Sequence, residues 1–504
     1  MTKERQAPTL RSSCGLLAGS WEDDVASFLG IPYAEPPTGE LRWAPPVPAA
    51  GWDGTRTATE RGPIAPQPPS RLEAVMGPMR APAISEDCLN LNAWTPAPGS
   101  AERLPTLVFI HGGGYMSGSG SAAWHDGRAL AARGPAVVVT INYRLGALGY
   151  LYLPPELSGG ETVANAGLLD QRLALEWVRE NAAALGGDPG NVTVFGQSGG
   201  AHSVLGLTAT DGEAPFSRAI FESAPLGMAA ADRGTAAATA ATFLRAARAA
   251  GLGELRELPP KRLLEAHRET MMASLAFGAV VPPFQLVADG EVLEREPVAA
   301  AMAGSADRIE LMLGFTREDA SPFFCADDAT WELGAGELTA RLAKDRGAPA
   351  AARFDAYLER SAVPPAAALA EMVSDEMMIA PAVRLAEARA SRGVGSHLFR
   401  FSWAPEATRG RLGACHTIEL PFVFGNPADW QGAPMLGEAG PGEIGDLSAI
   451  VQDAWLAFAG NGDPGSRGLG EWPAYAAGEA TTMDLDREPA LIDDPAAGRR
   501  DLWL

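Results

Sequence analysis

The stretch "NVTVFGQSGGAHSVLGLTA", residues 191–209, places a serine between an apolar run and a helical pattern. "VTVF" is typical of a buried strand, and the residues from Gly199 onward are typical of a helix. A serine flanked by glycines is common in ordinary loops, so Ser198 can be a simple turn residue. The spacing Gly196-Gln197-Ser198-Gly199-Gly200 also matches a nucleophile elbow, a strained strand–turn–helix that lifts a serine clear of a sheet. The rest of the sequence has to decide between these two interpretations.

Strand-like and helix-like segments alternate along the chain. Short runs rich in Val, Ile and Phe recur at 106–110, 136–141, 219–223, 311–315 and 397–402, and residues 170–185 show a helical pattern. Strands without polar alternation are typical of a parallel sheet buried on both faces. We therefore predict an α/β fold with a mostly parallel sheet flanked by helices.

Two alanine-rich regions, around 228–300 and 336–395, interrupt this alternation and are helical in character. Neither Gly/Ser linkers nor long charge runs separate them from the rest. The prediction is one domain over 1–504, with these regions inserted as helices over the sheet.

The composition narrows the classes of partner. Of the 504 residues, 40 are Lys or Arg and 62 are Asp or Glu, which gives a net charge of −22. Such a charge opposes nucleic acid or an anionic membrane as the main partner. The apolar runs are too short to cross a bilayer. These observations favour a small-molecule substrate, and they do not predict an oligomeric state.

The cysteines and the N-terminal residues bear on location. Cys14, Cys88, Cys325 and Cys415 are scattered without a CxxC pair, so the sequence predicts neither a metal site nor a disulfide framework. The first twenty residues lack the apolar core of a signal peptide. A reducing cytoplasm is the expected location.

A glycine-rich loop upstream supplies candidate hydrogen-bond donors. "FIHGGGYMSG", residues 109–118, follows a strand-like run. In acyl transfer, backbone N–H groups from such a loop and from the residue after the nucleophile stabilise the developing oxyanion. We predict an oxyanion hole formed by the N–H groups of Gly113, Gly114 and Gly199.

A serine nucleophile needs a base, and the chain has six histidines. His416 lies late in the chain in a loop after the 397–402 run, where the order serine–acid–histidine expects the base. The other five are placed as follows: His111 braces the glycine loop, His125 lies in a loop with no role assigned, His202 is structural on the helix after Ser198, His267 is solvated on a charged helix, and His397 starts a strand.

The acid is expected after a strand between the serine and the histidine. "LMLGFTREDASPFF", residues 311–324, offers Glu318 and Asp319. An acidic pair in a loop is usually solvated surface, but this pair directly follows a predicted buried strand. Both residues remain candidates for the acid.

These residues together resemble the type B carboxylesterases, the family of bacterial para-nitrobenzyl esterases and cholinesterases. The resemblance extends over nearly the whole chain, through "FLGIPYAEPPTGELRWAPP" (28–46), "SEDCLNLNAWTP" (85–96), "HTIELPFVFGN" (416–426) and "GNGDPG" (460–465). It implies an α/β-hydrolase fold and a serine esterase that acts through an acyl-enzyme without a metal or an organic cofactor. It also implies that Ser223 hydrogen-bonds near the acid and the base.

The departures from the family pattern are informative. The family acid is usually the second residue of an Asp-Glu pair followed by Gly, whereas here Glu318 and Asp319 precede an alanine. Ungapped matching gives Asp319 the acid role, with Glu318 as the alternative. The family commonly has Glu before the nucleophile, where this chain has Gln197. A carboxylate favours the charged form of a nearby histidine, so activity should extend to lower pH than in a Gln197→Glu variant.

The resemblance also bears on the substrate. Cholinesterases hold a quaternary ammonium with a tryptophan in the loop that corresponds to 67–84, which here contains no aromatic residue. Choline esters are therefore not the expected substrates. Met116 and Phe315 are candidate pocket residues, and Met76 and Met79 are candidates for the mouth.

The predicted function is hydrolysis of small carboxylic esters by the triad Ser198, Asp319 and His416. Two alternatives stay open. One is an amide or carbamate hydrolase with the same triad, and the other is a non-catalytic binding homologue.

Overall fold

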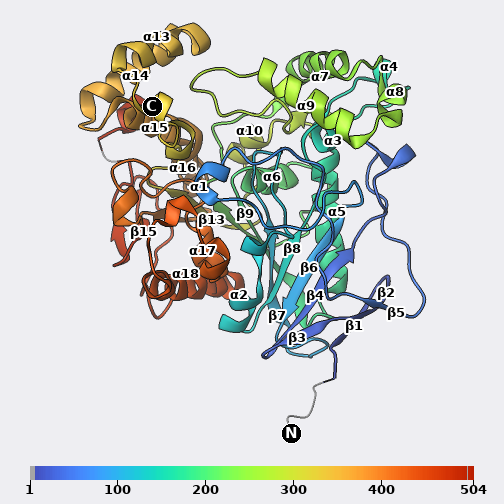
Figure 1. Ribbon diagram of the computed structural model, residues 1–504. Helices are drawn as coiled ribbons and strands as arrows, with labels where there is room; N and C mark the ends of the chain where they lie inside the picture. The colour runs from blue at the N-terminus through green and yellow to red at the C-terminus, as the bar shows by residue number, and fades with distance from the viewer. Residues whose placement is uncertain (1–5, 497, 504) are drawn as a thin grey trace.

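A single large sheet organises the chain. The computed structural model describes residues 6–496 and 498–503, and within them an 11-stranded sheet has the order β16-β15-β14-β13-β10-β9-β7-β8-β6-β4-β3 (Figure 1). Its strands are β3 (Ser20–Glu22), β4 (Val25–Pro32), β6 (Asn90–Thr95), β7 (Leu104–Ile110), β8 (Val137–Ile141), β9 (Gly187–Gln197), β10 (Arg218–Glu222), β13 (Glu310–Thr316), β14 (His397–Phe401), β15 (Thr482–Leu485) and β16 (Ala490–Ile492).

The middle of the sheet is parallel. Strands β15, β14, β13, β10, β9, β7 and β8 run in one direction, while β16 and the N-terminal strands β6, β4 and β3 pair antiparallel at the two edges. Each of the six apolar runs noted in the sequence coincides with a parallel strand to within one residue at either end of the run, except that β7 and β9 extend further beyond their runs. The predicted α/β fold with a mostly parallel, helix-flanked sheet is confirmed.

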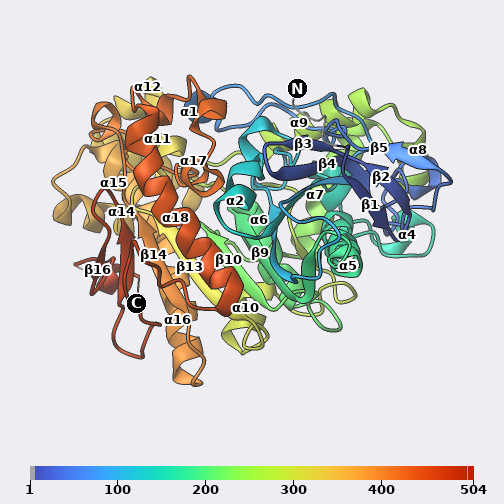
Figure 2. The ribbon, with the colours of Figure 1, turned by 90° about the horizontal axis from the view of Figure 1, so that it is seen from below.

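Both faces of the sheet are buried, because alternate residues of each central strand enter two different apolar clusters. In β7, Val108 and Ile110 belong to one cluster, and Leu107 and Phe109 to the other. Three helices pack on the first face: α5 (Ala166–Asn181), α6 (Gly199–Thr208) and α16 (Ala380–Ser391). The opposite face carries α2 (Arg128–Arg133), α17 (Leu420–Phe424) and α18 (Pro441–Asn461). Figure 2 shows α18 running across the sheet.

Two groups of helices lie beyond the carboxyl ends of the parallel strands, and Figure 1 shows them apart, in green and in orange. They are α7 (Arg233–Ala247), α8 (Leu252–Glu257) and α9 (Pro260–Ala273), and α13 (Ala335–Arg346), α14 (Ala348–Arg360) and α15 (Pro365–Ser374). They fall in the two alanine-rich regions. That these helices and the sheet form one domain stays a prediction. Among the described helices, none combines the length and apolar character needed to cross a membrane.

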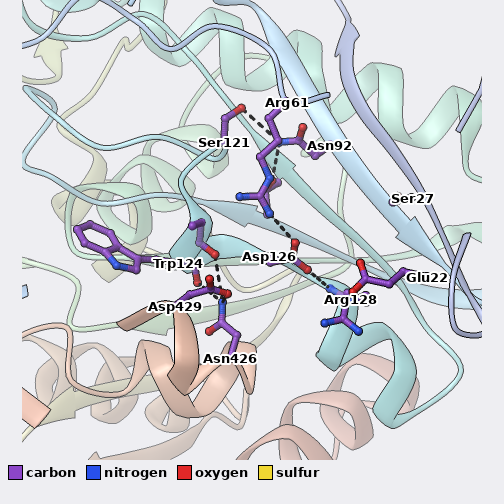
Figure 3. A network of polar contacts seen from close by, with 12 residues as sticks. Glu22, Ser27, Arg61, Asn92, Ser121, Trp124, Asp126, Arg128, Asn426 and Asp429 are labelled. Atoms are coloured by element: carbon purple, nitrogen blue, oxygen red, sulfur yellow. Dashed lines mark hydrogen bonds and ion pairs between the residues drawn. The ribbon is translucent and has the colours of Figure 1, made fainter. Parts of the chain in front are cut away.

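A polar network ties three distant segments together at the loop that precedes α2 (Figure 3). The Arg61 guanidinium donates to Asp126 at 2.5 Å. The same carboxylate accepts the N–H of Arg128 at 2.9 Å and so stabilises the start of α2. The Asn426 amide donates to the carbonyls of Ala123 and Trp124. The network anchors the chain that leaves the glycine-rich loop.

Candidate active site

Ser198 stands at the turn between β9 and α6 in a strained conformation. Its φ and ψ are 55° and −124°, a region that a residue with a side chain rarely adopts. The flanking glycines permit the turn: a Cβ atom at Gly200 would lie 2.1 Å from the carbonyl oxygen of Ile110, and one at Gly196 would lie 2.8 Å from the nitrogen of Ala201. The Ser198 N–H donates to the Glu222 carbonyl at 2.8 Å. The local structure is a strand–turn–helix of the elbow type.

The structure brings His416 and Asp319 into contact from two different loops. Nδ1 of His416 lies 2.5 Å from Oδ1 of Asp319, and both side chains are buried. Oδ2 of Asp319 accepts the Ser223 hydroxyl at 2.7 Å and the Thr316 N–H at 2.9 Å. The carboxylate is therefore held in place and keeps the Nδ1 proton on the imidazole.

Glu318 does not contact His416. One oxygen of its carboxylate pairs with Arg317 at 2.7 Å, and the other accepts the Ala414 N–H at 2.7 Å. Of the two acids left open by the sequence, Asp319 is the one beside the imidazole.

The other ring nitrogen of His416 faces the elbow. Its Nε2 lies 3.1 Å from the side-chain nitrogen of Gln197. Because Nδ1 keeps its proton and donates it to Asp319 in a hydrogen bond, Nε2 carries a lone pair and accepts from the Gln197 amide. Ser198 and His416 line the same pocket, so the hydroxyl and the imidazole open onto one space.

The three glycines of the predicted oxyanion hole line this pocket as well. Within the described residues, the N–H groups of Gly113 and Gly114 have no protein acceptor. Gly199 is the first residue of α6, so its N–H group has no partner inside the helix. Free N–H groups beside a helix N-terminus favour negative charge at that point.

Burial lowers the pKa of the other five histidines. It brings those of His111, His202 and His267 to about 4, and that of His125 to about 3. His111 bonds to the Gly112 carbonyl and His202 to the Tyr115 hydroxyl, as their expected structural roles require. The expectation of a solvated His267 is wrong. Its side chain points inward from α9 against Phe284, while the acidic and basic residues of that helix face solvent.

The pocket is open to solvent at its mouth, and most of the residues that line it are apolar. Met116, a candidate pocket residue from the sequence, lies in its lining. Phe315 does not line the pocket. It lies on the same face of β13 as Leu311 and Leu313, and its side chain packs in the core beneath α16. The aromatic ring that reaches the pocket is Phe323, with its centroid 5.8 Å from that of His416.

Other lining residues were not found from the sequence. Met271 comes from α9, and Met377 and Met378 from the π-helical turn η3 (Asp375–Ile379). Arg71 comes from the loop before α1 (Glu73–Met76). No sequence motif marks them, because only the folding of the helical regions over the sheet brings them to the serine. Met76 and Met79 border a neighbouring hollow.

Two buried carboxyl groups lie close behind the site. Glu222 accepts a hydrogen bond from the Trp455 indole at 2.8 Å, and burial raises its pKa to about 8. Burial, and next the proximity of Glu222, raise the pKa of Glu419 well above its usual range. Within the described residues, no group of His, Cys, Asp and Glu could hold a metal ion.

Comparison with known proteins agrees with this geometry. The profile of the carboxylesterase family matches residues 6–503. The para-nitrobenzyl esterase of Bacillus subtilis (strain 168) is 36% identical over 498 residues, and the phenmedipham hydrolase of Pseudarthrobacter oxydans is 34% identical over 487 residues, each over 96% of both chains.

Solved structures give the same result. A thermophilic PNB esterase matches with a TM-score of 0.86 and 35% identity, over 99% of this chain and 100% of that chain. A carboxylesterase of Geobacillus stearothermophilus matches with a TM-score of 0.85 and 33% identity, over 98% and 100%. The fold is that of the α/β-hydrolases, and the protein is a serine enzyme that hydrolyses carboxylic esters. The chain belongs to the carboxylesterase family.

Proposed function

We propose that Ser198, His416 and Asp319 form the catalytic triad of this esterase. The observation that carries the proposal is the 2.5 Å contact between Asp319 and His416 at a pocket that also holds Ser198 in a strained turn. His416 takes the serine proton at Nε2 as the hydroxyl oxygen attacks the ester carbonyl. Asp319 keeps the imidazole in the required tautomer and stabilises its charged form.

The N–H groups of Gly113, Gly114 and Gly199 bind the oxyanion of the tetrahedral intermediate. Such donors act strongly because they are oriented before the charge develops. The alcohol leaves with the proton from His416, and the acyl group remains on Ser198. Water then attacks the acyl-enzyme with His416 again as the base.

The pocket supports esters with apolar acyl or alcohol groups as substrates. Five methionine side chains and Phe323 contribute to a wall that contains Pro68, Leu72 and Val280. Methionine adapts to irregular shapes, which suits a broad range of esters. We propose that the same catalytic residues also hydrolyse amides and carbamates, at lower rates than esters, since one relative is named a phenmedipham hydrolase.

The test is a series of para-nitrophenyl esters of increasing acyl length, with matched anilides and carbamates. Ester hydrolysis by the wild type should fall by about 10⁴-fold or more in a Ser198→Ala variant, because a triad without its nucleophile retains only binding and the oxyanion donors. Turnover by the variant at the wild-type rate would remove Ser198 from the mechanism.

We also propose that the protein is located in a reducing cytoplasm. The thiols of Cys14, Cys88, Cys325 and Cys415 are all free, which is typical of proteins in that compartment. Cell fractionation followed by activity measurement tests it, and activity confined to the medium or to the envelope fraction would contradict it.

A further inference from the structure

Arg71 brings a positive charge to a pocket whose walls are mostly apolar. It lies in the loop before α1, and among the described lining residues it is the one side chain with a permanent charge. Its guanidinium carbon is 5.7 Å from the ring centroid of Phe323, and that ring is 5.8 Å from the imidazole of His416. The Phe323 ring is therefore a neighbour of both the guanidinium and the candidate base.

The charge of Arg71 has no counter-ion in the protein. Within the described residues, its guanidinium makes neither an ion pair nor a hydrogen bond. Two arginines of the same region are paired, Arg61 with Asp126 (Figure 3) and Arg80 with Asp429. Surrounding protein atoms lower the pKa of Arg71, and no acidic neighbour raises it. Arg71 is exposed, so its unpaired guanidinium is accessible to a ligand from solvent as well as from the pocket.

The position on Phe323 leaves the guanidinium available to a ligand. A cation over an aromatic face is held by the ring quadrupole, while its N–H groups remain free to donate in the plane of the fork. That fork matches the two oxygens of a carboxylate. The remainder of the lining supplies apolar contacts for the carbon chain between the ester and such a carboxylate.

We propose that Arg71 is a specificity-determining residue that selects ester substrates carrying a carboxylate away from the scissile bond. The inference rests on the proposed function, since it assigns a substrate class to that same pocket. The local positive charge offsets the repulsion that the acidic protein exerts on anions. Monoesters of dicarboxylic acids and esters of hydroxy acids or carboxyphenols have the required chemistry.

The test uses matched pairs of neutral and anionic esters. On the acyl side, para-nitrophenyl hexanoate is compared with the mono-para-nitrophenyl ester of adipic acid. On the alcohol side, 4-carbamoylphenyl butyrate is compared with 4-carboxyphenyl butyrate. The measured quantity is the ratio of kcat/KM for the anionic ester to that for its neutral partner.

The variants are Arg71→Gln, Arg71→Lys and a matched control, Arg56→Gln. Arg56 also stacks on an aromatic ring, with its guanidinium carbon 5.5 Å from the Trp52 centroid, but it lies in β5 (Thr55–Thr57) outside the pocket. Both glutamine variants lose the same charge, so the control removes the effect of net charge on the ratio.

In at least one pair, Arg71→Gln should lower the ratio by about tenfold or more, as expected for loss of a charge-assisted hydrogen bond. Arg71→Lys should lower it less, and Arg56→Gln should leave it unchanged. Added salt should lower the ratio in the wild type more than in Arg71→Gln.

A ratio that Arg71→Gln leaves unchanged in both pairs overturns the inference, as does an equal fall in Arg56→Gln. Turnover of the neutral esters tests the proposed function separately. Its persistence in Ser198→Ala would contradict the triad, whatever the ratio shows.

Discussion

The side-chain nitrogen of Gln197 lies 3.1 Å from Nε2 of His416, on the side of the imidazole opposite Asp319. Nε2 of His416 is the atom that has to accept the proton of Ser198 in the proposed reaction. The Gln197 amide is a neutral donor, whereas a carboxylate at the same position would be a charged acceptor. The residue before the nucleophile is therefore in direct contact with the base.

Substitution of Gln197 by Glu should shift the acid limb of the pH profile of kcat/KM to higher pH by about one unit. The reason is that a carboxylate at this distance favours the charged imidazolium form of His416. The profile is measured on a neutral para-nitrophenyl ester between pH 4.5 and 9. Gln431→Glu adds the same charge at an exposed position and should leave the limb in place. An unchanged limb in Gln197→Glu would contradict the role of Gln197.

The two adjacent acids should differ greatly in their effect on rate. Asp319→Asn should lower kcat by about 10⁴-fold, because an amide at this position favours the wrong tautomer of the imidazole. The Glu318 carboxylate contacts Arg317 and the Ala414 N–H and not the imidazole. Glu318→Gln should therefore retain most of the activity. Steady-state kinetics and melting temperatures of both variants check this, and equal losses of kcat would reassign the acid.

Two glycines of the oxyanion hole should tolerate alanine differently. A Cβ atom at Gly113 would lie 2.0 Å from the Ser117 carbonyl oxygen. The backbone φ of Gly113 is +109°, a conformation that residues with a side chain rarely adopt. Gly113→Ala should displace the donor and lower kcat by about 10²–10³-fold. At Gly199 the nearest atom to such a Cβ is the Tyr115 nitrogen at 3.3 Å, so Gly199→Ala should retain most of its activity. A larger loss in Gly199→Ala than in Gly113→Ala, at matched melting temperatures, would contradict the assignment.

The buried Glu222 should make stability depend on pH. Its pKa is raised from 4.5 to about 8, so between these values the folded protein holds a proton that the unfolded chain has lost. The free energy of unfolding therefore falls by up to about 1.4 kcal/mol per pH unit over this range and levels off above it.

Glu222→Gln removes this dependence and keeps an acceptor for the Trp455 indole. The melting temperature of the variant relative to the wild type should therefore be higher at pH 8.5 than at pH 6. The exposed Glu488→Gln serves as the control. A difference between Glu222→Gln and the wild type that stays constant with pH would mean that Glu222 is charged in the folded protein at both values.

The strands of the parallel sheet could be predicted from the sequence because both of their faces are buried. Residues 107–110 of β7 and 311–315 of β13 are apolar without interruption, as is typical of strands buried on both faces. Helix α5 begins at Ala166 rather than near residue 170, since its first turn is fixed by tertiary contacts. Arg144 pairs with Asp170 at 2.6 Å and also donates to the carbonyl of Ala166.

The candidate site could be predicted where a local motif carries the chemistry, as for Ser198 and the glycine loop. The choice between Glu318 and Asp319 needed the partners that each carboxylate finds in three dimensions. Phe315 and Phe323 illustrate the same limit. Strand alternation directs the first into the core, and the short helix α11 (Ser321–Phe324), which follows β13, carries the second to the pocket.

The central claim is that Ser198 carries the acyl group during turnover, and mass spectrometry of the acid-quenched enzyme tests it most directly. The enzyme is mixed with a para-nitrophenyl ester, quenched within the first turnover and digested. We predict an acyl mass shift on the peptide that contains Ser198, with no acyl adduct in Ser198→Ala. An acyl group on another residue, or an adduct that persists in Ser198→Ala, would contradict the account.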